Sequence, residues 1–358
     1  GATQIQKGVR SVSFSGDKGF MYKANLCLRT ALKILKPIHS FRVRNEKDYY
    51  QKLYQYDWEQ LLSPTQTFAV EVTLATDLFH HSQYMTLRAK DAIVDKLRAT
   101  TGKRPNVDTL HPDLQLFIHI QSDNQVIVSL DTSGASLHHR GYRTQTNIAP
   151  INEVLAAGIL LLSGWKGQSD FLDPMCGSGT FLIEAAMIAR NIAPGANRNF
   201  AAEKWSVIDK NLWTDIRDEA FSNEDLTKNL KIYGSDIDEK SIKIAKENAE
   251  KAGVEEDIIF EVKDFKDIES PAKYGAMIVN PPYGERLMGD ENIEELYRNF
   301  GDFCKKKLSK WSYYIITSYE NFENAFNKKA TKNRKLYNGG IKCYYYQYFG
   351  DRKNGYKH

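Results

Sequence analysis

The stretch SDFLDPMCGSGT, Ser169 to Thr180, decides the fold, because it joins a short apolar strand to a glycine loop. The apolar run ends at Asp173, and Gly177 and Gly179 precede FLIEAAMIARNIA, which has helical spacing. Glycines at such a turn let the backbone approach a ligand closely. The loop lacks the Gly-Lys-Ser/Thr of a phosphate-binding loop and the third glycine of a dinucleotide-binding loop. It therefore suits a smaller nucleoside that carries an amino acid.

Strands and helices alternate on both sides of this loop. APINEVLAAGILLLSG before it and SIKIAKENAEKAG after it read as helices, and KIYGSDID, IIFEVKD, YGAMIV and SYYIITS read as strands. The final KLYNGGIKCYYYQYF predicts a hairpin around Asn338-Gly339-Gly340. Such alternation predicts an α/β fold with a parallel, doubly wound, Rossmann-like sheet covered by helices on both faces.

The first portion of the chain mixes strands and helices differently. Helical spacing predicts one helix over Asn25 to Ile38 that Pro37 stops, and a second over Thr86 to Gly102. Thr67 to Ala75 alternates as a strand does, and LQLFIHIQ and QVIVSLDTS read as two strands around a turn. The pattern predicts a small α+β module.

Acidic residues follow the next two predicted strands. Asp236 ends KIYGSDID, where a carboxylate can accept hydrogen bonds from both ribose hydroxyls. Asp264 ends the following strand, where a carboxylate can bind an adenine amino group. Asp236 lies 63 residues after Asp173 instead of about 20; the excess predicts an insertion between Asn197 and Asn223.

The fourth strand end carries VNPPYGERL, Val279 to Leu287. Two prolines cannot extend a sheet, so the prolines predict a rigid loop at the carboxyl end of a strand, where open α/β sheets bind ligands. Asn280 and Tyr283 on that loop suit a planar group that bears an amine. A proline turn with a solvated Asn explains this motif equally well when it is taken alone.

Composition and charge limit the classes of protein. The 358 residues are 42% hydrophobic and 26% charged, with no long apolar run and no recognisable signal segment. The four widely spaced cysteines predict reduced thiols in a cytoplasmic protein, without a disulfide frame or metal site. Residues 1–70 contain 11 Lys/Arg and 5 Asp/Glu, and residues 325–358 contain 9 and 1. Residues 201–269 contain 11 and 19. The basic ends are those expected of a phosphate-tracking surface.

These motifs together resemble a known family. LDPMCGSGTFLIEAA, GSDID, VKDF and VNPPYGERL are similar to class I S-adenosylmethionine-dependent methyltransferases that modify exocyclic amines. LDTSGASLHHRGYR, APINEVLAA and KDAIVDKLR extend the resemblance over essentially the whole chain, to the THUMP-domain guanine-N2 methyltransferases of 23S ribosomal RNA.

The resemblance implies two domains, an enzymatic activity and a partner. Residues 1–135 are expected to form part of a ferredoxin-like segment and a THUMP RNA-binding domain, and residues 136–358 the methyltransferase domain. The implied partner is 23S ribosomal RNA or its precursor, with no membrane and no metal. Asn280, Pro281 and Tyr283 are the expected catalytic residues. S-adenosyl-L-methionine is the implied cofactor, and the residues expected to bind it are Asp173, Met175, Gly177, Gly179, Thr180, Asp236, Ile237, Asp264 and Phe265.

Three alternatives stay open at the level of sequence. The Asn-Pro-Pro-Tyr motif also occurs in enzymes that methylate adenine N6 or the glutamine side chain of proteins. A protein-glutamine methyltransferase needs neither a basic RNA-binding module nor the cationic stretch from Arg140 to Arg143, and both features count against it. The intact glycine loop and proline motif count against an RNA-binding scaffold without activity.

Overall fold

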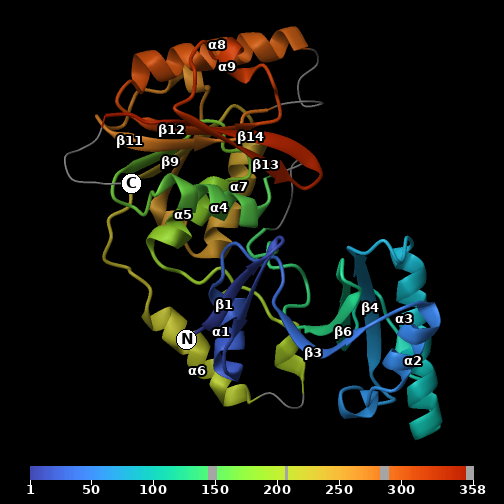
Figure 1. Ribbon diagram of the computed structural model, residues 1–358. Helices are drawn as coiled ribbons and strands as arrows, with labels where there is room; N and C mark the ends of the chain where they lie inside the picture. The colour runs from blue at the N-terminus through green and yellow to red at the C-terminus, as the bar shows by residue number, and fades with distance from the viewer. Residues whose placement is uncertain (144–150, 206–208, 283–289, 352–358) are drawn as a thin grey trace. The chain divides into compact units, whose positions relative to one another are not determined.

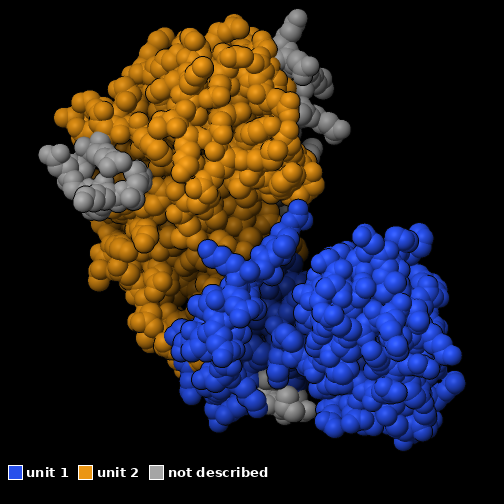
Figure 2. Space-filling view, viewed as in Figure 1, with its two compact units in different colours: residues 1–25, 32–137, 199–215 blue, residues 26–31, 138–198, 216–358 orange. Residues whose placement is uncertain are grey.

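The chain forms two compact units that interleave in sequence. The computed structural model describes residues 1–143, 151–205, 209–282 and 290–351. Unit 1 comprises Gly1–Asn25, Leu32–Leu137 and Asn199–Asp215, and unit 2 comprises Leu26–Ala31, His138–Arg198 and Ile216–His358. Figure 2 distinguishes the two units by colour. Each unit includes a short segment from a distant part of the chain.

Unit 2 is built on a seven-stranded sheet of order β10-β9-β8-β11-β12-β14-β13. Its strands are β8 (Asp170–Asp173), β9 (Ile232–Asp236), β10 (Ile258–Val262), β11 (Gly275–Val279), β12 (Ser312–Thr317), β13 (Lys332–Asn338) and β14 (Ile341–Tyr348). The first five strands in this order pair in parallel, whereas β14 is antiparallel to β12 and to β13. The order reverses between β8 and β11, which makes their carboxyl ends the topological switch point of the sheet.

Helices cover both faces of this sheet (Figure 1). Ile278 of β11 packs into one apolar cluster with the first group of helices, and its neighbours Met277 and Val279 pack into a second cluster with α8 and α9. Consecutive strand residues point to opposite faces, so both clusters are filled from one strand. The first group is α4 (Glu153–Ser163), α5 (Thr180–Ala189) and α7 (Glu239–Ala252), and the second is α8 (Asp290–Lys307) and α9 (Phe322–Ala325). The predicted doubly wound α/β class is confirmed.

Unit 1 holds a five-stranded sheet of order β3-β7-β6-β4-β5 and a two-stranded sheet of β1 and β2. The strands are β1 (Thr3–Gly8), β2 (Ser11–Ser15), β3 (Leu35–Arg42), β4 (Thr67–Leu74), β5 (Asn106–Val107), β6 (Leu114–Ile120) and β7 (Gln125–Asp131). The helices are α1 (Lys18–Cys27), α2 (Glu46–Tyr54) and α3 (Ser82–Thr101). Side chains of α2 and α3 pack against the larger sheet around Phe68 and Leu116.

The predicted helix over Asn25 to Ile38 is wrong. Helix α1 ends at Cys27, and β3 begins at Leu35. Strand β3 lies at the edge of its sheet, where a proline is tolerated, and its register against β7 shifts between Pro37 and His39. Helical spacing alone cannot detect this, because pairing with β7 is a contact between residues far apart in sequence.

The predicted insertion between Asn197 and Asn223 contains the segment that returns to unit 1. The N–H of Ala202 donates to the carbonyl of Thr132 at 3.0 Å. The rings of Trp213 and Tyr22 lie 4.8 Å apart, edge to face. Trp205 packs against the cluster of apolar residues around Phe68. The helices of this region are η2 (Ala201–Lys204) and α6 (Lys210–Ser222). The other 3-10 helices in the described residues are η1 (Trp58–Gln60), η3 (Glu255–Asp257) and η4 (Phe265–Asp267).

Candidate functional site

Four polar residues lie along the carboxyl edge of the unit 2 sheet, at its switch point and on the two strands beyond β8. Asp173 and Asp236 are the last residues of β8 and β9, Asp264 follows β10, and Asn280 follows β11. The strands pair in parallel, with Asp173 opposite Gly234 and Asp236 opposite Val262. Parallel strands present their carboxyl ends at one edge, so the predicted polar residues lie along a single edge of the sheet.

The glycine loop after β8 is fixed by hydrogen bonds to the end of β8 and to the neighbouring strand β9. Oδ1 of Asp173 accepts the N–H of Met175 at 3.2 Å. The N–H of Cys176 donates to the carbonyl of Ser235 at 2.9 Å, and that of Gly177 donates to Oδ2 of Asp236 at 2.9 Å. The loop is therefore held in place before any ligand arrives.

The two glycines of this loop are required for different reasons. Gly177 has φ of +52°, and a Cβ there would meet open space, so only its left-handed backbone demands glycine. Gly179, with φ of +81°, precedes the first residue of α5, and a Cβ there would lie 3.1 Å from the Cβ of Ala245. Gly179 thus lets α5 and α7 approach closely, whereas the open space at Gly177 leaves room for a ligand.

The electrostatics of the loop are dominated by burial. Asp173 is 2% exposed, and burial, followed by the nearby charge of Asp236, raises the pKa of its carboxyl well above the usual value. Burial also raises the pKa of the Cys176 thiol, with the two aspartates adding to the effect. Cys176 is therefore a neutral packing residue, whereas the carboxyl groups of this edge can receive ligand donors.

Asn280 carries an acceptor that nothing in the described part of the chain satisfies. Its Oδ1 is buried and has no hydrogen-bond partner there. An unpaired buried oxygen is costly, and this one lies at the switch point of the sheet, where it can accept a hydrogen bond from a ligand. Pro281 is buried, and the carbonyl of Pro282 accepts the hydroxyl of Tyr297 at 3.4 Å. Tyr297 in turn pairs with Oγ1 of Thr317 at 2.8 Å, which anchors the loop to β12. The predicted Tyr283 lies outside the described residues.

The remaining predicted cofactor residues surround this edge with differing orientations. The hydroxyl of Thr180 accepts a hydrogen bond from Arg143 at 3.0 Å, and Oδ1 of Asp264 accepts the N–H of Lys266 at 3.0 Å. Ile237 is 72% exposed, and Met175 is partly buried against the cluster beneath α8. The ring of Phe265 is 5% exposed and packs edge to face on Phe300 and Phe303, so only its backbone is left for a ligand.

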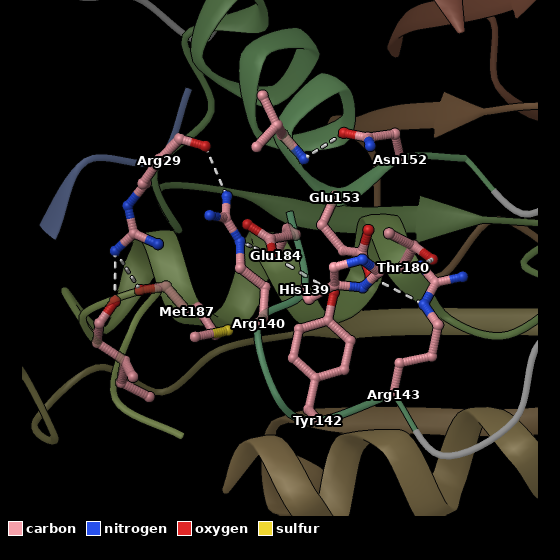
Figure 3. Close-up of polar contacts among 12 residues, drawn as sticks. Arg29, His139, Arg140, Tyr142, Arg143, Asn152, Glu153, Thr180, Glu184 and Met187 are labelled. Atoms are coloured by element: carbon pink, nitrogen blue, oxygen red, sulfur yellow. Dashed lines mark hydrogen bonds and ion pairs between the residues drawn. The ribbon is translucent and has the colours of Figure 1, made fainter. Parts of the chain in front are cut away.

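A buried ionic network, which the sequence analysis missed, lies beside the loop (Figure 3). Nε of Arg140 lies 3.3 Å from Oε1 of Glu184, with the two side chains 2% and 0% exposed. The hydroxyl of Tyr142 donates to the same oxygen at 3.3 Å. Arg29 donates to the carbonyl of Met187 at 3.1 Å. Glu184 within the apolar run FLIEAA was the available signal, because a lone buried acid requires a cationic partner.

A second buried pair joins the first turns of two helices. Arg143 donates to Glu153, the first residue of α4, at 2.8 Å, and to Thr180, the first residue of α5, at 3.0 Å. Arg140 and Arg143 are therefore engaged inside unit 2 with buried glutamates. The sequence argument that counted this stretch as an RNA-binding feature is wrong, because these cations are occupied by structural partners.

Comparison with known proteins assigns each part of the chain to a domain family. Residues 140–347 match the family model described as an RMKL-like methyltransferase domain, residues 43–131 match a THUMP domain, and residues 1–35 match an RlmL ferredoxin-like domain. Within the described residues, no helix is both long and apolar enough to span a bilayer.

Two relatives and one solved structure are similar over nearly the whole chain. YpsC of Bacillus subtilis, which carries the name of an RNA methyltransferase, is 40% identical over 94% of this chain and 88% of its own length. The ribosomal RNA large subunit methyltransferase K/L of Shewanella frigidimarina is 39% identical over 96% of this chain, but only 49% of its own, so this chain spans about half of it. The crystal structure of SMU.472, named as a methyltransferase and complexed with SAH, is 38% identical, with a TM-score of 0.87 over 98% of this chain and 92% of that one. This chain belongs to the RMKL-like methyltransferase family and carries a THUMP domain ahead of its methyltransferase domain.

Proposed function

We propose that this protein transfers a methyl group to N2 of a guanine in 23S ribosomal RNA, with the base held by Asn280, Pro281 and Tyr283. The observation that carries the proposal is the buried, unpartnered Oδ1 of Asn280 at the switch point of the sheet. An exocyclic amine offers the two N–H donors that this oxygen and a neighbouring backbone carbonyl can accept.

The predicted cofactor, S-adenosyl-L-methionine, is confirmed by membership of the methyltransferase family. The residues at the switch point fit it: the space beside Gly177 admits a ligand, and the strand-end carboxylates can accept donors from a nucleoside. When bound, this group supplies a methyl that its positively charged sulfur has already activated. We assign Asp236 to the ribose hydroxyls and Asp264 to the adenine amino group, with the glycine loop at the amino-acid end.

The chain's own residues orient the nucleophile. The lone pair of an aromatic amine is delocalised into its ring, which makes the nitrogen a poor nucleophile. Oδ1 of Asn280 and the carbonyl of Pro281, by accepting the two N–H bonds, favour a pyramidal nitrogen whose lone pair points at the methyl. Tyr283 stacks on the base in this proposal and keeps its plane fixed, a contact worth about 1–3 kcal/mol. Positioning therefore supplies most of the catalysis, and the proton leaves to water after transfer.

Unit 1 supplies the contacts that select RNA in this proposal. A guanine within a helix must leave its stack to reach Asn280, which costs a few kcal/mol. Phosphate contacts made by the basic first portion of the chain offset this cost, since residues 1–70 contain 11 Lys/Arg and 5 Asp/Glu. The THUMP domain and the names of the two relatives support RNA as the substrate. We also propose that the boundary between the RNA-binding and methyltransferase domains lies between residues 135 and 136.

The second candidate is methylation of a protein glutamine or of adenine N6. Either substrate presents an NH₂ group to the same acceptor pair, so the geometry at Asn280 favours both as much as guanine. The THUMP domain favours RNA over a protein. Adenine carries its amine at a different ring position from guanine, so the identity of the methylated nucleoside distinguishes the two substrates.

Nucleoside mass spectrometry tests the proposal directly. The protein is incubated with labelled S-adenosylmethionine and unmodified 23S RNA, and the RNA is digested to nucleosides. We expect labelled N2-methylguanosine, and no label in RNA incubated with Asn280→Ala. Label in adenosine would replace guanine by adenine as the target. Label on protein with none on RNA would establish the glutamine activity in its place.

A further inference from the structure

The β13–β14 hairpin extends beyond the edge of the sheet that carries the site. Thr317, the last residue of β12, pairs with Tyr344, and Tyr344 pairs with Lys335 across the hairpin. The hairpin continues for three more paired positions, to Asn338 opposite Ile341. At about 3.3 Å per residue, its tip reaches about 10 Å past the carboxyl end of β12. Figure 1 shows the hairpin projecting past its neighbouring strands.

The overhang, meaning the three paired positions of the hairpin beyond the end of β12, lies at the same edge of the sheet as Asn280. β11 pairs with β12 in parallel, so both end at the carboxyl edge, and β14 lies directly beyond β12. With about 4.8 Å between adjacent strands, β14 and β13 lie about 10 Å and 14 Å from β11 across the sheet. A few nucleotides of an RNA strand span such a distance.

The hairpin has the composition of a nucleic-acid contact. β13, the turn and β14 contain the cations Lys332, Arg334, Lys335 and Lys342 and no carboxylate. Tyr337 is 57% exposed on the overhang, where no described element covers it. Lys335 is exposed as well, and it lies on the same face as Tyr337 because the two residues are two apart in a strand.

The partner of this surface follows from its chemistry. Lysines without neighbouring acids on their own hairpin attract phosphates, and an exposed aromatic ring offers a stacking platform to an unpaired base. Lys342 is the exception, because Glu320 lies 2.8 Å from its Nζ and offsets its charge. Glu320 acts on Lys335 through its charge but forms no ion pair with it among the described residues. Lys335 and Tyr337 therefore present a charge and a ring together to a ligand.

We propose that the tip of the β13–β14 hairpin, through Lys335 and Tyr337, binds the single-stranded RNA that flanks the target nucleotide. The proposal rests on the proposed RNA methyltransferase function and adds a substrate contact to it. A base drawn into the site at Asn280 leaves its neighbours unstacked, and Tyr337 replaces the stacking that one of them has lost. Lys335 contacts the adjacent phosphate and sets the direction of the strand.

Binding and turnover of four variants test this surface. The variants are Lys335→Ala, Tyr337→Ala, Tyr337→Phe and the control Lys246→Ala, which removes an exposed lysine from α7, the helix that packs against β9 and β10 near the opposite edge of the sheet. The probe is a fluorescein-labelled single-stranded RNA of about 12 nucleotides with one central guanine, measured by anisotropy. We expect Tyr337→Ala to weaken binding about 5- to 100-fold and Tyr337→Phe to bind as the unaltered protein does. Lys335→Ala should lower the slope of log affinity against log salt by about 0.7.

Three outcomes separate this proposal from the proposed function. The hairpin contact would be overturned, even if N2-methylguanosine is formed, by either of two results. In the first, Tyr337→Ala and Lys335→Ala keep the affinity and salt slope of the unaltered protein. In the second, Lys246→Ala loses as much affinity as they do. Hairpin-dependent binding without N2-methylguanosine would keep the contact and overturn the guanine reaction. In steady-state kinetics with 23S RNA, the Tyr337→Ala loss should appear mainly in the KM for RNA, with S-adenosylmethionine affinity and Tm unchanged.

Discussion

The backbone N–H of Gly177 donates to Oδ2 of Asp236 at 2.9 Å, so the glycine loop after one strand is held by the acid that ends the next. Oδ1 of the same carboxylate accepts the N–H of Asp238, the residue that caps α7. Asp236 therefore organises the loop on one side and the start of a helix on the other, and its position depends on both.

Replacing Asp236 should weaken cofactor binding through two separate losses. Asp236→Ala removes the acceptor of Gly177 and the carboxylate assigned to the ribose, and we expect S-adenosylhomocysteine affinity to fall about 10- to 100-fold in calorimetry. Asp236→Asn retains one acceptor oxygen, so its S-adenosylhomocysteine affinity should lie between that of Asp236→Ala and that of the unaltered protein. Equal affinities for Asn and Ala variants would show that the loop does not depend on this oxygen.

Replacing Asp173 should change the pH dependence of stability. Its pKa lies well above the usual 3.8, because burial and then Asp236 disfavour the charged form. The folded protein keeps a proton that the unfolded chain releases, so this group's contribution to stability is complete below 3.8 and is lost as pH rises through the raised pKa. Asp173→Asn has no such proton. Its free energy of unfolding should exceed that of the unaltered protein at neutral pH and converge with it in acid.

Urea unfolding between about pH 4 and pH 8 measures this difference. Asp302→Asn, which removes an exposed acid from α8, is the matched control for the loss of a surface carboxylate. A constant offset between Asp173→Asn and the unaltered protein across this range would contradict the raised pKa. Asp173→Asn should also bind S-adenosylhomocysteine about 10- to 100-fold more weakly if the carboxylate receives a ligand donor.

Asn280→Ala should separate catalysis from cofactor binding. Asn280 is assigned to the target amine alone, so its loss should lower kcat about 100- to 1000-fold while calorimetry shows unchanged S-adenosylhomocysteine affinity. Removing an unpaired buried oxygen should also raise the free energy of unfolding by about 1 kcal/mol. A large loss of cofactor affinity would place Asn280 against the cofactor and not against the base.

Glu184→Gln should destabilise unit 2 strongly. The change leaves Arg140, 2% exposed, without its buried counter-charge, and such a loss costs about 3–5 kcal/mol. The control Asp123→Asn removes the partner of Arg42, where the side chains are 52% and 70% exposed, and should cost less than about 1 kcal/mol. Chemical denaturation of both variants measures the two costs, and equal costs would contradict a buried role for Glu184.

The site could be located from sequence because its residues obey a local rule. Asp173, Asp236, Asp264 and Asn280 each end or follow a strand, and parallel strands end at one edge. The sequence therefore predicted which residues share that edge without any long-range contact being known. The final hairpin was predicted for the same reason, since Asn338-Gly339-Gly340 specifies its turn locally.

The errors came from interactions between distant residues. Arg140 reads as an exposed cation, but Glu184, 44 residues later on an apolar helix, is a buried partner that explains its burial. Leu35 and its neighbours have helical spacing, yet they pair with β7 about a hundred residues away. Local patterns carry no information about either partner, so neither feature could be read from them.

The interleaving of the two units has a consequence for how such a protein can be divided. Residues 26–31 belong to unit 2, and residues 199–215 belong to unit 1. Removing residues 1–130 would take Arg29 from unit 2 and would leave the segment around Trp213 without Tyr22. Neither unit corresponds to an uninterrupted stretch of gene, so recombination at a single junction cannot exchange one unit and leave the other whole.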